Sequence, residues 1–355
     1  MDYYIREVQW DENVQKTAGI KARDDAEAIL AARGWKEVNI PSPKDEEAPH
    51  GAAAKIAAHK KTEKLWEEHL AALNAGDRLL VQFPCVVHSI FLADLFGRLD
   101  RKGIKVILLI HDLELLRAAK RKDKSFKKRV RLWIEEKRCL KSCTKIIAHN
   151  REMIRYLQKE GIARNRLINL GIFDYRIPDF QQNKVPAARK DDPVIIAGTL
   201  RPHKAKYAYE LPGEPQFALY GVGYEAPGQE NVVYYGAFEP DELPFALKGS
   251  FGLVWDGDSA DTCSGIYGEY LRINNPHKTS LYLAAGIPVA VWKEAALAKF
   301  VEKYGCGITV SSIAEIAEWQ KALSEEEYAA MRRNAGKIGK RLRGGEYLTR
   351  AVEKA

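Results

Sequence analysis

The segment from Ser264 to Trp292 reads SGIYGEYLRINNPHKTSLYLAAGIPVAVW and joins a polar helix start to a buried strand. Asn274 and Asn275 are residue types that cap helices, and Pro276 suits the first helical position. Lys278 then falls in the first turn, where the positive end of the helix dipole disfavours cations and attracts phosphate. This lysine indicates an anionic ligand, although an ordinary Asn-Pro cap with a solvated lysine explains the pattern equally well.

Short apolar runs alternate with helical patterns in both halves of the chain, which predicts mostly parallel sheets covered on both faces. The expected strands of the first half are Tyr3 to Val8, Lys36 to Ile40, Leu79 to Val87, Ile104 to Ile110 and Lys145 to His149. Expected helices between them are Asp25 to Arg33, Ala52 to Asn74, Ser89 to Arg101, Leu113 to Leu140 and Arg151 to Glu160. The expected strands of the second half are Val194 to Ala197, Gln216 to Tyr220, Val232 to Tyr235, Phe251 to Trp255, Pro288 to Trp292 and Ile308 to Val310.

The length of 355 residues exceeds the usual size of one core and predicts two domains. Periodicity is lost over residues 172–192, where prolines and charges gather, so we expect the linker there. The domains then cover residues 1–171 and 193–323. A charged helix within residues 324–355 is expected to pack back on the first domain.

The composition excludes several classes of protein and indicates the cellular compartment. The 5 cysteines are scattered without a CxxC pair, which indicates neither a disulfide framework nor a zinc site. No apolar run approaches the ~20 residues that cross a bilayer, and the first residues lack the pattern of a signal peptide. The sequence therefore predicts a cytoplasmic protein.

The formal charge of +8 is concentrated between Arg117 and Lys145, where apolar residues recur at helical spacing. A packed helix with a solvated cationic face explains this patch most simply. Contact with an anionic membrane surface, making the protein peripheral, is the second interpretation. We expect no nucleic-acid partner, because no recognised nucleic-acid motif accompanies the charge.

Several motifs resemble the bacterial galactofuranosyltransferase and glucosyltransferase-type family of GT-B enzymes. They are KARDDAEAIL, IHDLELLR, IIAHNREMIRYL, IAGTLRPHK and YYGAFEPDELP, and SFGLVWDGDS leading into GEYLRINNPHKTSLYLAAGIPVAVW. The resemblance implies an α/β fold of two Rossmann-like parallel-sheet domains facing an interdomain cleft. It also implies that the C-terminal domain holds a uridine diphosphate (UDP)-sugar donor and that the N-terminal domain faces the acceptor.

The resemblance implies donor-site roles for several residues of the second domain. Asn274 and Lys278 match its donor motif and would hold the diphosphate, and Arg201 after a strand end would pair with phosphate. Tyr220 or Tyr224 would stack on uracil or contact the ribose, or would simply close the core.

Further positions complete the expected donor site. Thr17, Gly19 and Lys21 belong to the loop that the resemblance places at the cleft. Glu269, just ahead of the donor motif, would bond the donor sugar or balance charge.

Glycosyl transfer needs a base for the acceptor hydroxyl, and His111 and Asp112 end a buried strand where side chains reach a cleft. We predict Asp112 as the base and His111 as the alternative, although an Asp before LELLR also suits a helix cap. Asp256 and Asp258 form a DxD pair that suits a hard metal. A cationic helix start makes a metal redundant, so we expect no metal cofactor.

The sequence thus predicts a hexosyltransferase that moves galactofuranose or glucose from a UDP-sugar to a glycan, a lipid-linked saccharide or a glycoprotein. A UDP-sugar epimerase on the same scaffold is one alternative. A non-catalytic, membrane-associated scaffold that binds sugar nucleotides is another. A homo-oligomer is compatible with either class.

Overall fold

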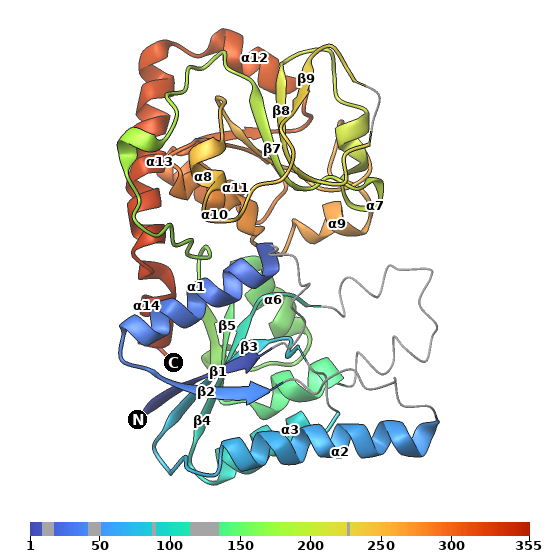
Figure 1. The fold of residues 1–355 in the computed structure, drawn as a ribbon, viewed down its shortest axis with the longest axis vertical. Helices are drawn as coiled ribbons and strands as arrows, with labels where there is room; N and C mark the ends of the chain where they lie inside the picture. The colour runs from blue at the N-terminus through green and yellow to red at the C-terminus, as the bar shows by residue number, and fades with distance from the viewer. Residues whose placement is uncertain (9–17, 42–50, 87–89, 114–134, 226–227) are drawn as a thin grey trace.

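The computed structural model describes residues 1–8, 18–41, 51–86, 90–113, 135–225 and 228–355. Within these ranges it contains two six-stranded parallel sheets, stacked one above the other in Figure 1. The first sheet has the order β2-β1-β3-β4-β5-β6 and the second β12-β11-β10-β7-β8-β9. This arrangement confirms the α/β class and the two facing Rossmann-like sheets that the sequence predicts.

The strands of the first sheet are β1 Asp2–Val8, β2 Lys36–Pro41, β3 Arg78–Phe83, β4 Lys105–Ile110, β5 Lys145–Ala148 and β6 Leu167–Asn169. Its helices are α1 Ala18–Ala32, α2 Ala52–His69, α3 Leu92–Arg101 and α6 Arg151–Lys159. The central strands β3 and β4 are buried beyond their first residue, as expected for strands of a parallel sheet that is covered on both faces. The sequence pattern did not predict β6, since three residues are too short to show an alternating pattern.

The second sheet contains β7 Val194–Thr199, β8 Phe217–Val222, β9 Val232–Tyr234, β10 Gly252–Val254, β11 Val289–Trp292 and β12 Gly307–Val310. Its helices are α7 Pro202–Ala205, α8 Leu243–Ala246, α9 Gly265–Tyr270, α10 His277–Ala284, α11 Ala298–Tyr304 and α12 Glu315–Ala322. Two further helices follow, α13 Glu325–Arg343 and α14 Glu346–Val352. Ser324 and Glu327 form a reciprocal capping box that fixes the start of α13.

The chain returns to the first sheet at its end, where α14 lies beside α1 (Figure 1). Gly345 permits this approach, because a Cβ at this position would lie 2.6 Å from a side-chain carbon of Ile29. The carboxylate of Asp174, in the segment that joins the sheets, accepts hydrogen bonds from the Tyr347 and Leu348 amides. One buried apolar cluster therefore runs from α1 through this segment into the second sheet.

Two expectations about local structure need correction. The helix at the donor motif starts at His277 with Pro276 as its N-cap, and no side chain caps it. Asn274 and Asn275 therefore do not cap α10, because the Asn275 side chain bonds to the other domain instead. The expected helix from Leu113 to Leu140 lies largely outside the described residues, and only residues 135–142 are seen as helix.

Candidate donor and acceptor site

Lys278 lies in the first turn of α10, close to the end of β10. Its Nζ donates to the Trp255 carbonyl at 2.8 Å and to Oδ1 of Asp256 at 3.0 Å. The Lys278 side chain is 14% exposed and that of Asp256 10%. The Lys278 ammonium group is thus held at the end of β10 by the Asp256 carboxylate. An anionic ligand that binds Lys278 would have to replace this carboxylate.

The DxD pair is divided between two environments. Asp256 is buried and engages Lys278, whereas Asp258 is exposed and packs against the backbone of Gly265. Lys278 Nζ, 3.0 Å from Oδ1 of Asp256, disfavours a divalent cation at that carboxylate for as long as the two groups are paired. Within the described ranges, no three His, Cys, Asp or Glu side chains are grouped as metal ligands.

The two asparagines before α10 have different partners. Oδ1 of Asn274 is buried, and no described residue bonds to it. The Asn275 side chain donates to the carbonyls of His149 and Gly171 and accepts a hydrogen bond from Asn150. Asn275 therefore ties the start of α10 to the first domain, while Asn274 keeps an unused acceptor beside it.

His277 begins α10 inside an aromatic cluster. Its ring centroid lies 5.0 Å from that of Tyr175 and 6.1 Å from that of Phe173. Burial lowers the pKa of His277 to about 4, so the ring is neutral at physiological pH. Nε2 of His277 is buried, and no described residue bonds to it.

Arg201 and the two tyrosines lie near the ends of β7 and β8. The Arg201 side chain runs along the backbone of Gly223, where a Cβ would approach Cγ of Arg201 to 2.4 Å. Tyr220 is 1% exposed, and its ring stacks on Tyr235 with centroids 4.9 Å apart. The structure thus places Tyr220 in the core.

Tyr224 is only partly buried and lies in a group of tyrosines beyond the end of β8. Its ring centroid is 5.3 Å from that of Tyr209 and 5.4 Å from that of Tyr234. The Tyr224 hydroxyl oxygen is buried, and no described residue bonds to it. Of the two tyrosines, Tyr224 is the one with a polar group left to bind a ligand.

The N-terminal loop is only partly described. Thr17 lies outside the described residues, and Gly19 lies in the first turn of α1. Lys21 is buried, and its Nζ bonds to Asp25 at 2.8 Å and to Asp241 of the second domain at 2.7 Å. Lys21 therefore bridges the domains through carboxylates.

His111 and Asp112 follow β4 at the edge of the first sheet that faces the second domain. The backbone N–H of Leu113 donates to the Tyr270 hydroxyl at 2.9 Å, which joins this edge to α9. Glu269, on the same helix, pairs with Arg272 at 3.2 Å. The structure thus brings His111, Asp112 and Glu269 to neighbouring elements across the domain boundary.

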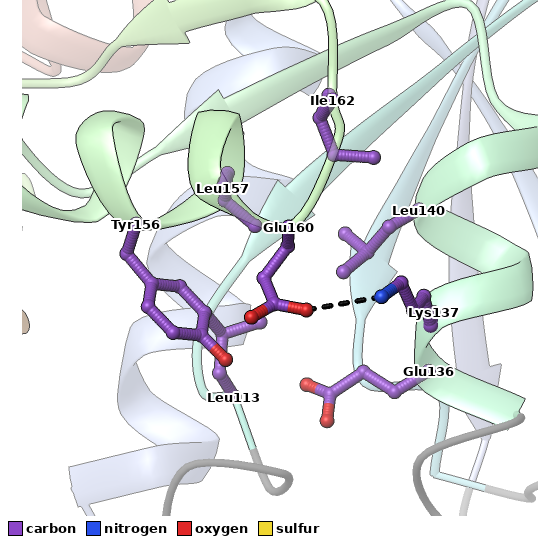
Figure 2. Close-up of a pocket in the computed structure, with 8 residues that line it drawn as sticks. All are labelled: Leu113, Glu136, Lys137, Leu140, Tyr156, Leu157, Glu160 and Ile162. Atoms are coloured by element: carbon purple, nitrogen blue, oxygen red, sulfur yellow. Dashed lines mark hydrogen bonds and ion pairs between the residues drawn. The ribbon is translucent and has the colours of Figure 1, made fainter.

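A small pocket of about 20 Å³ lies between α6 and residues 135–142, and Figure 2 shows its lining. Apolar side chains such as Leu140 and Leu157 form its walls. Lys137 and Glu160 pair at its edge with 3.1 Å between Nζ and Oε2. A volume of this size holds about one water molecule, so the pocket is not a sugar site.

The basic segment from Arg117 to Lys145 lies mostly outside the described residues. In its described part, Arg138 pairs with Asp94, and Glu135 and Glu136 are buried. No helix among the described residues is both long and apolar enough to cross a membrane.

Both halves of the chain match domains of a known protein family. The description "Glucosyltransferase 3-like, N-terminal domain" matches residues 2–172, and "Glucosyltransferase 3-like, C-terminal domain" matches residues 194–355. The chain belongs to the glucosyltransferase 3-like family. This membership confirms the resemblance seen in the sequence motifs.

Two relatives and one solved structure show how far the similarity extends. Beta-1,6-galactofuranosyltransferase WbbI of Escherichia coli (strain K12) is 33% identical over 356 residues, which cover 99% of this chain and 97% of the relative. Glucosyltransferase 3 of Streptococcus gordonii is 28% identical over 290 residues, or 80% of each chain. Anabaena HepE, solved in complex with UDP, matches with a TM-score of 0.54 and 12% identity over 99% of this chain and 98% of its own. The structural match shows the GT-B fold.

In this glucosyltransferase 3-like chain, the structure adds residues that the sequence analysis did not select. His149 and Asn150 bind the start of α10, and Gln82 and Glu27 lie behind His111. His149 and Asn150 stand in the quoted motif IIAHNREMIRYL directly after a strand, which was a usable signal. Gln82 lies within an apolar strand and Glu27 within a helix, so no local pattern indicated either.

Proposed function

We propose that this glycosyltransferase moves a hexose, galactofuranose or glucose, from a UDP-sugar to a hydroxyl of a glycan, a lipid-linked saccharide or a glycoprotein. The observation that carries the proposal is the cationic start of α10, where Lys278 lies in the first turn and Oδ1 of Asn274, just before the helix, has no partner among the described residues. HepE, which has the same fold, was solved with UDP. The 33% identity to a galactofuranosyltransferase makes UDP-galactofuranose the first donor to test.

The diphosphate would lie at the start of α10, where unpaired N–H groups and the helix dipole favour negative charge. Lys278 would leave Asp256 and bind the phosphates, and Asn274 would bind a hydroxyl through its free acceptor. Arg201 would supply a second cation from the end of β7. The strong attraction between Lys278 and a diphosphate supports leaving-group stabilisation without a metal.

The remaining donor contacts are assigned from their places around this centre. Tyr224 would contact the uracil or ribose, since its hydroxyl has no partner among the described residues and Tyr220 is enclosed in the core. Glu269 would bond the donor sugar from α9. Gly19 and Lys21 would approach from the first domain, and Lys21 would do so by leaving Asp25 and Asp241.

The reaction forms a bond between the acceptor oxygen and the anomeric carbon. The bond from that carbon to the diphosphate oxygen breaks, and UDP leaves with the electron pair. The proton of the acceptor hydroxyl goes to a base on the first domain, for which His111 and Asp112 are the candidates. Both follow β4, next to the α9 contact made by Leu113 and Tyr270.

The decisive assay incubates the protein with UDP-galactofuranose or UDP-glucose, with and without a mixture of saccharide acceptors, in the presence of a chelator. We expect mass spectrometry to show an acceptor heavier by one hexose, together with free UDP. A changed sugar nucleotide without any acceptor would instead support the epimerase alternative. Binding without turnover for every donor and acceptor would support the non-catalytic scaffold.

A further inference from the structure

Three side chains from different elements form a chain of hydrogen bonds behind the end of β4. Nε2 of His111 lies 2.8 Å from Oε1 of Gln82, which is on β3. Nε2 of Gln82 donates to Oε1 of Glu27, on α1, at 2.9 Å. Gln82 is 3% exposed, so its amide depends on these partners rather than on water.

The chemistry of these groups fixes the direction of each hydrogen bond. An ionised Glu27 only accepts, so the NH2 group of Gln82 must face it. The Arg23 carbonyl, 3.5 Å from the same nitrogen, is a second and weaker acceptor. The Gln82 oxygen therefore faces His111, and the imidazole must carry its proton on Nε2 to donate to that oxygen. A neutral ring of this kind keeps a lone pair on Nδ1.

Nδ1 of His111 has no hydrogen-bond partner in the part of the chain that the structure describes. The ring is stacked on Phe173 with centroids 5.5 Å apart and an interplanar angle of 12°. Phe173 also contacts His277, the first residue of α10, with centroids 6.1 Å apart. One aromatic ring thus separates His111 from the helix that would hold the diphosphate.

We infer that Gln82 and Glu27 are positioning residues that hold His111 in the tautomer whose Nδ1 accepts the proton of the acceptor hydroxyl. The inference rests on the proposed glycosyl transfer and chooses His111 over Asp112 as the base. Gln82 and Glu27 do not touch the substrate. They act by determining which nitrogen of the imidazole is basic.

The hydrogen-bonded relay from Glu27 through Gln82 to His111 also determines how the rate of glycosyl transfer depends on pH. Burial raises the pKa of Glu27 to about 7, and the charges facing it are Arg6 from β1, Arg23 and Asp24 from α1, and Glu37 from β2. An ionised Glu27 can only accept from Gln82, whereas a protonated Glu27 also has an O–H that can donate to the Gln82 oxygen. Protonation of Glu27 thus permits the reversed Gln82 amide, whose NH2 group would face His111 and leave the proton of the ring on Nδ1.

His111 itself does not titrate in this range. Its own pKa is held well below the ordinary value by burial and by Arg23, His149 and His277. Transfer should therefore fall as the pH drops through about 7, and the responsible group is Glu27 rather than His111.

The test compares Gln82→Leu, Glu27→Gln and the exchanged pair Glu27→Gln/Gln82→Glu, with Gln320→Leu as the control for losing a buried amide. Gln320 is 6% exposed and bonds to Asp192 and Ser250, away from the relay. We expect Gln82→Leu to lower kcat by about 10-fold to 100-fold with donor KM and UDP affinity unchanged. The exchanged pair should recover most of kcat, because a carboxylate at position 82 again accepts from Nε2. Gln320→Leu should leave kcat within about twofold.

Nitrogen-15 NMR of the histidine rings reads the tautomer directly, with His111→Gln identifying the signal. We expect Nε2 protonation in the wild type, a shift toward mixed tautomers in Gln82→Leu, and no acid limb near pH 7 in Glu27→Gln. A Gln82→Leu variant with wild-type His111 shifts and wild-type kcat would overturn the relay. If Gln82→Leu does not fold, an unchanged acid limb in Glu27→Gln overturns it equally. Failure of the wild type to bind UDP would instead refute the proposed function, which the tautomer signal does not measure.

Discussion

The backbone N–H of Asn275 donates to Nδ1 of His149 over 2.9 Å, and this bond fixes the start of α10 against the end of β5. Nε2 of His149 donates to the Ile110 carbonyl at 3.0 Å, so both ring nitrogens are used by a neutral imidazole. Burial accordingly lowers the pKa of His149 to about 3. The start of α10 is thus held against the first domain.

Asn275→Ala should destabilise the protein, because the carbonyls of His149 and Gly171 and the amide of Asn150 lose their partner. We expect a loss of about 2–4 kcal/mol in the free energy of unfolding, measured by urea denaturation. Asn274→Ala is the matched control for stability, since no described residue bonds to its Oδ1. Asn274→Ala should change the free energy of unfolding by less than about 1 kcal/mol and should weaken UDP binding. Equal stability losses in the two variants would contradict this division of roles.

Asp256→Asn should strengthen UDP binding. The Asp256 carboxylate holds Lys278 at 3.0 Å and competes with a diphosphate for the same ammonium group. Replacing the charge with an amide keeps the shape and removes the competition, so we expect the Kd for UDP to fall about threefold to tenfold. Weaker binding in this variant would show that Asp256 takes part in the donor site instead.

Asp174→Asn should alter the pH dependence of stability. Burial raises the pKa of Asp174 to about 7, which outweighs the two amide bonds from α14. A raised folded-state pKa gives stability that is present below the unfolded value of 3.8 and lost as the pH rises through about 7. Denaturation at pH 5 and pH 8 should therefore show a decline of up to about 3 kcal/mol in the free energy of unfolding of the wild type relative to the variant. If the free energies of unfolding of the wild type and Asp174→Asn changed in parallel with pH, this prediction would be wrong.

Gly223→Ala should weaken UDP binding by displacing Arg201. The glycine has φ +81, and an added Cβ would lie 2.4 Å from Cγ of Arg201. Gly213→Ala is a suitable control, since a Cβ there has no atom within 4 Å. Calorimetry should give a higher Kd for Gly223→Ala alone. Unchanged affinity would remove Arg201 from the donor site.

Strand positions could be predicted from sequence because buried parallel strands are continuous apolar runs. The expected strand from Ile104 to Ile110 is β4 nearly as written, and the segment from Pro288 to Trp292 contains β11. The position of Lys278 in the first turn of a helix could also be predicted, because the residues that indicate a helix start lie next to it in the sequence. The three-residue β6 carried no comparable pattern.

The partners of the site residues could not be predicted, since they come from distant parts of the chain. Asp256 holds Lys278 across 22 residues, and Asn275 reaches His149 across 126. The bonds from His111 through Gln82 to Glu27 likewise depend on how α1 packs on the sheet. Periodicity reports which face of an element is buried, but it does not report which polar groups meet there.

Isothermal titration of UDP into the wild type and Lys278→Ala, with chelator present, tests the central claim most directly. Lys321→Ala serves as the control, because Lys321 is 73% exposed and pairs only with the exposed Glu214 among the described residues. We predict metal-free binding by the wild type and the control, with an affinity at least about tenfold lower in Lys278→Ala, as expected for losing a charged hydrogen bond. Equal affinity in all three proteins, or no binding without a divalent metal, would contradict a diphosphate site at the start of α10.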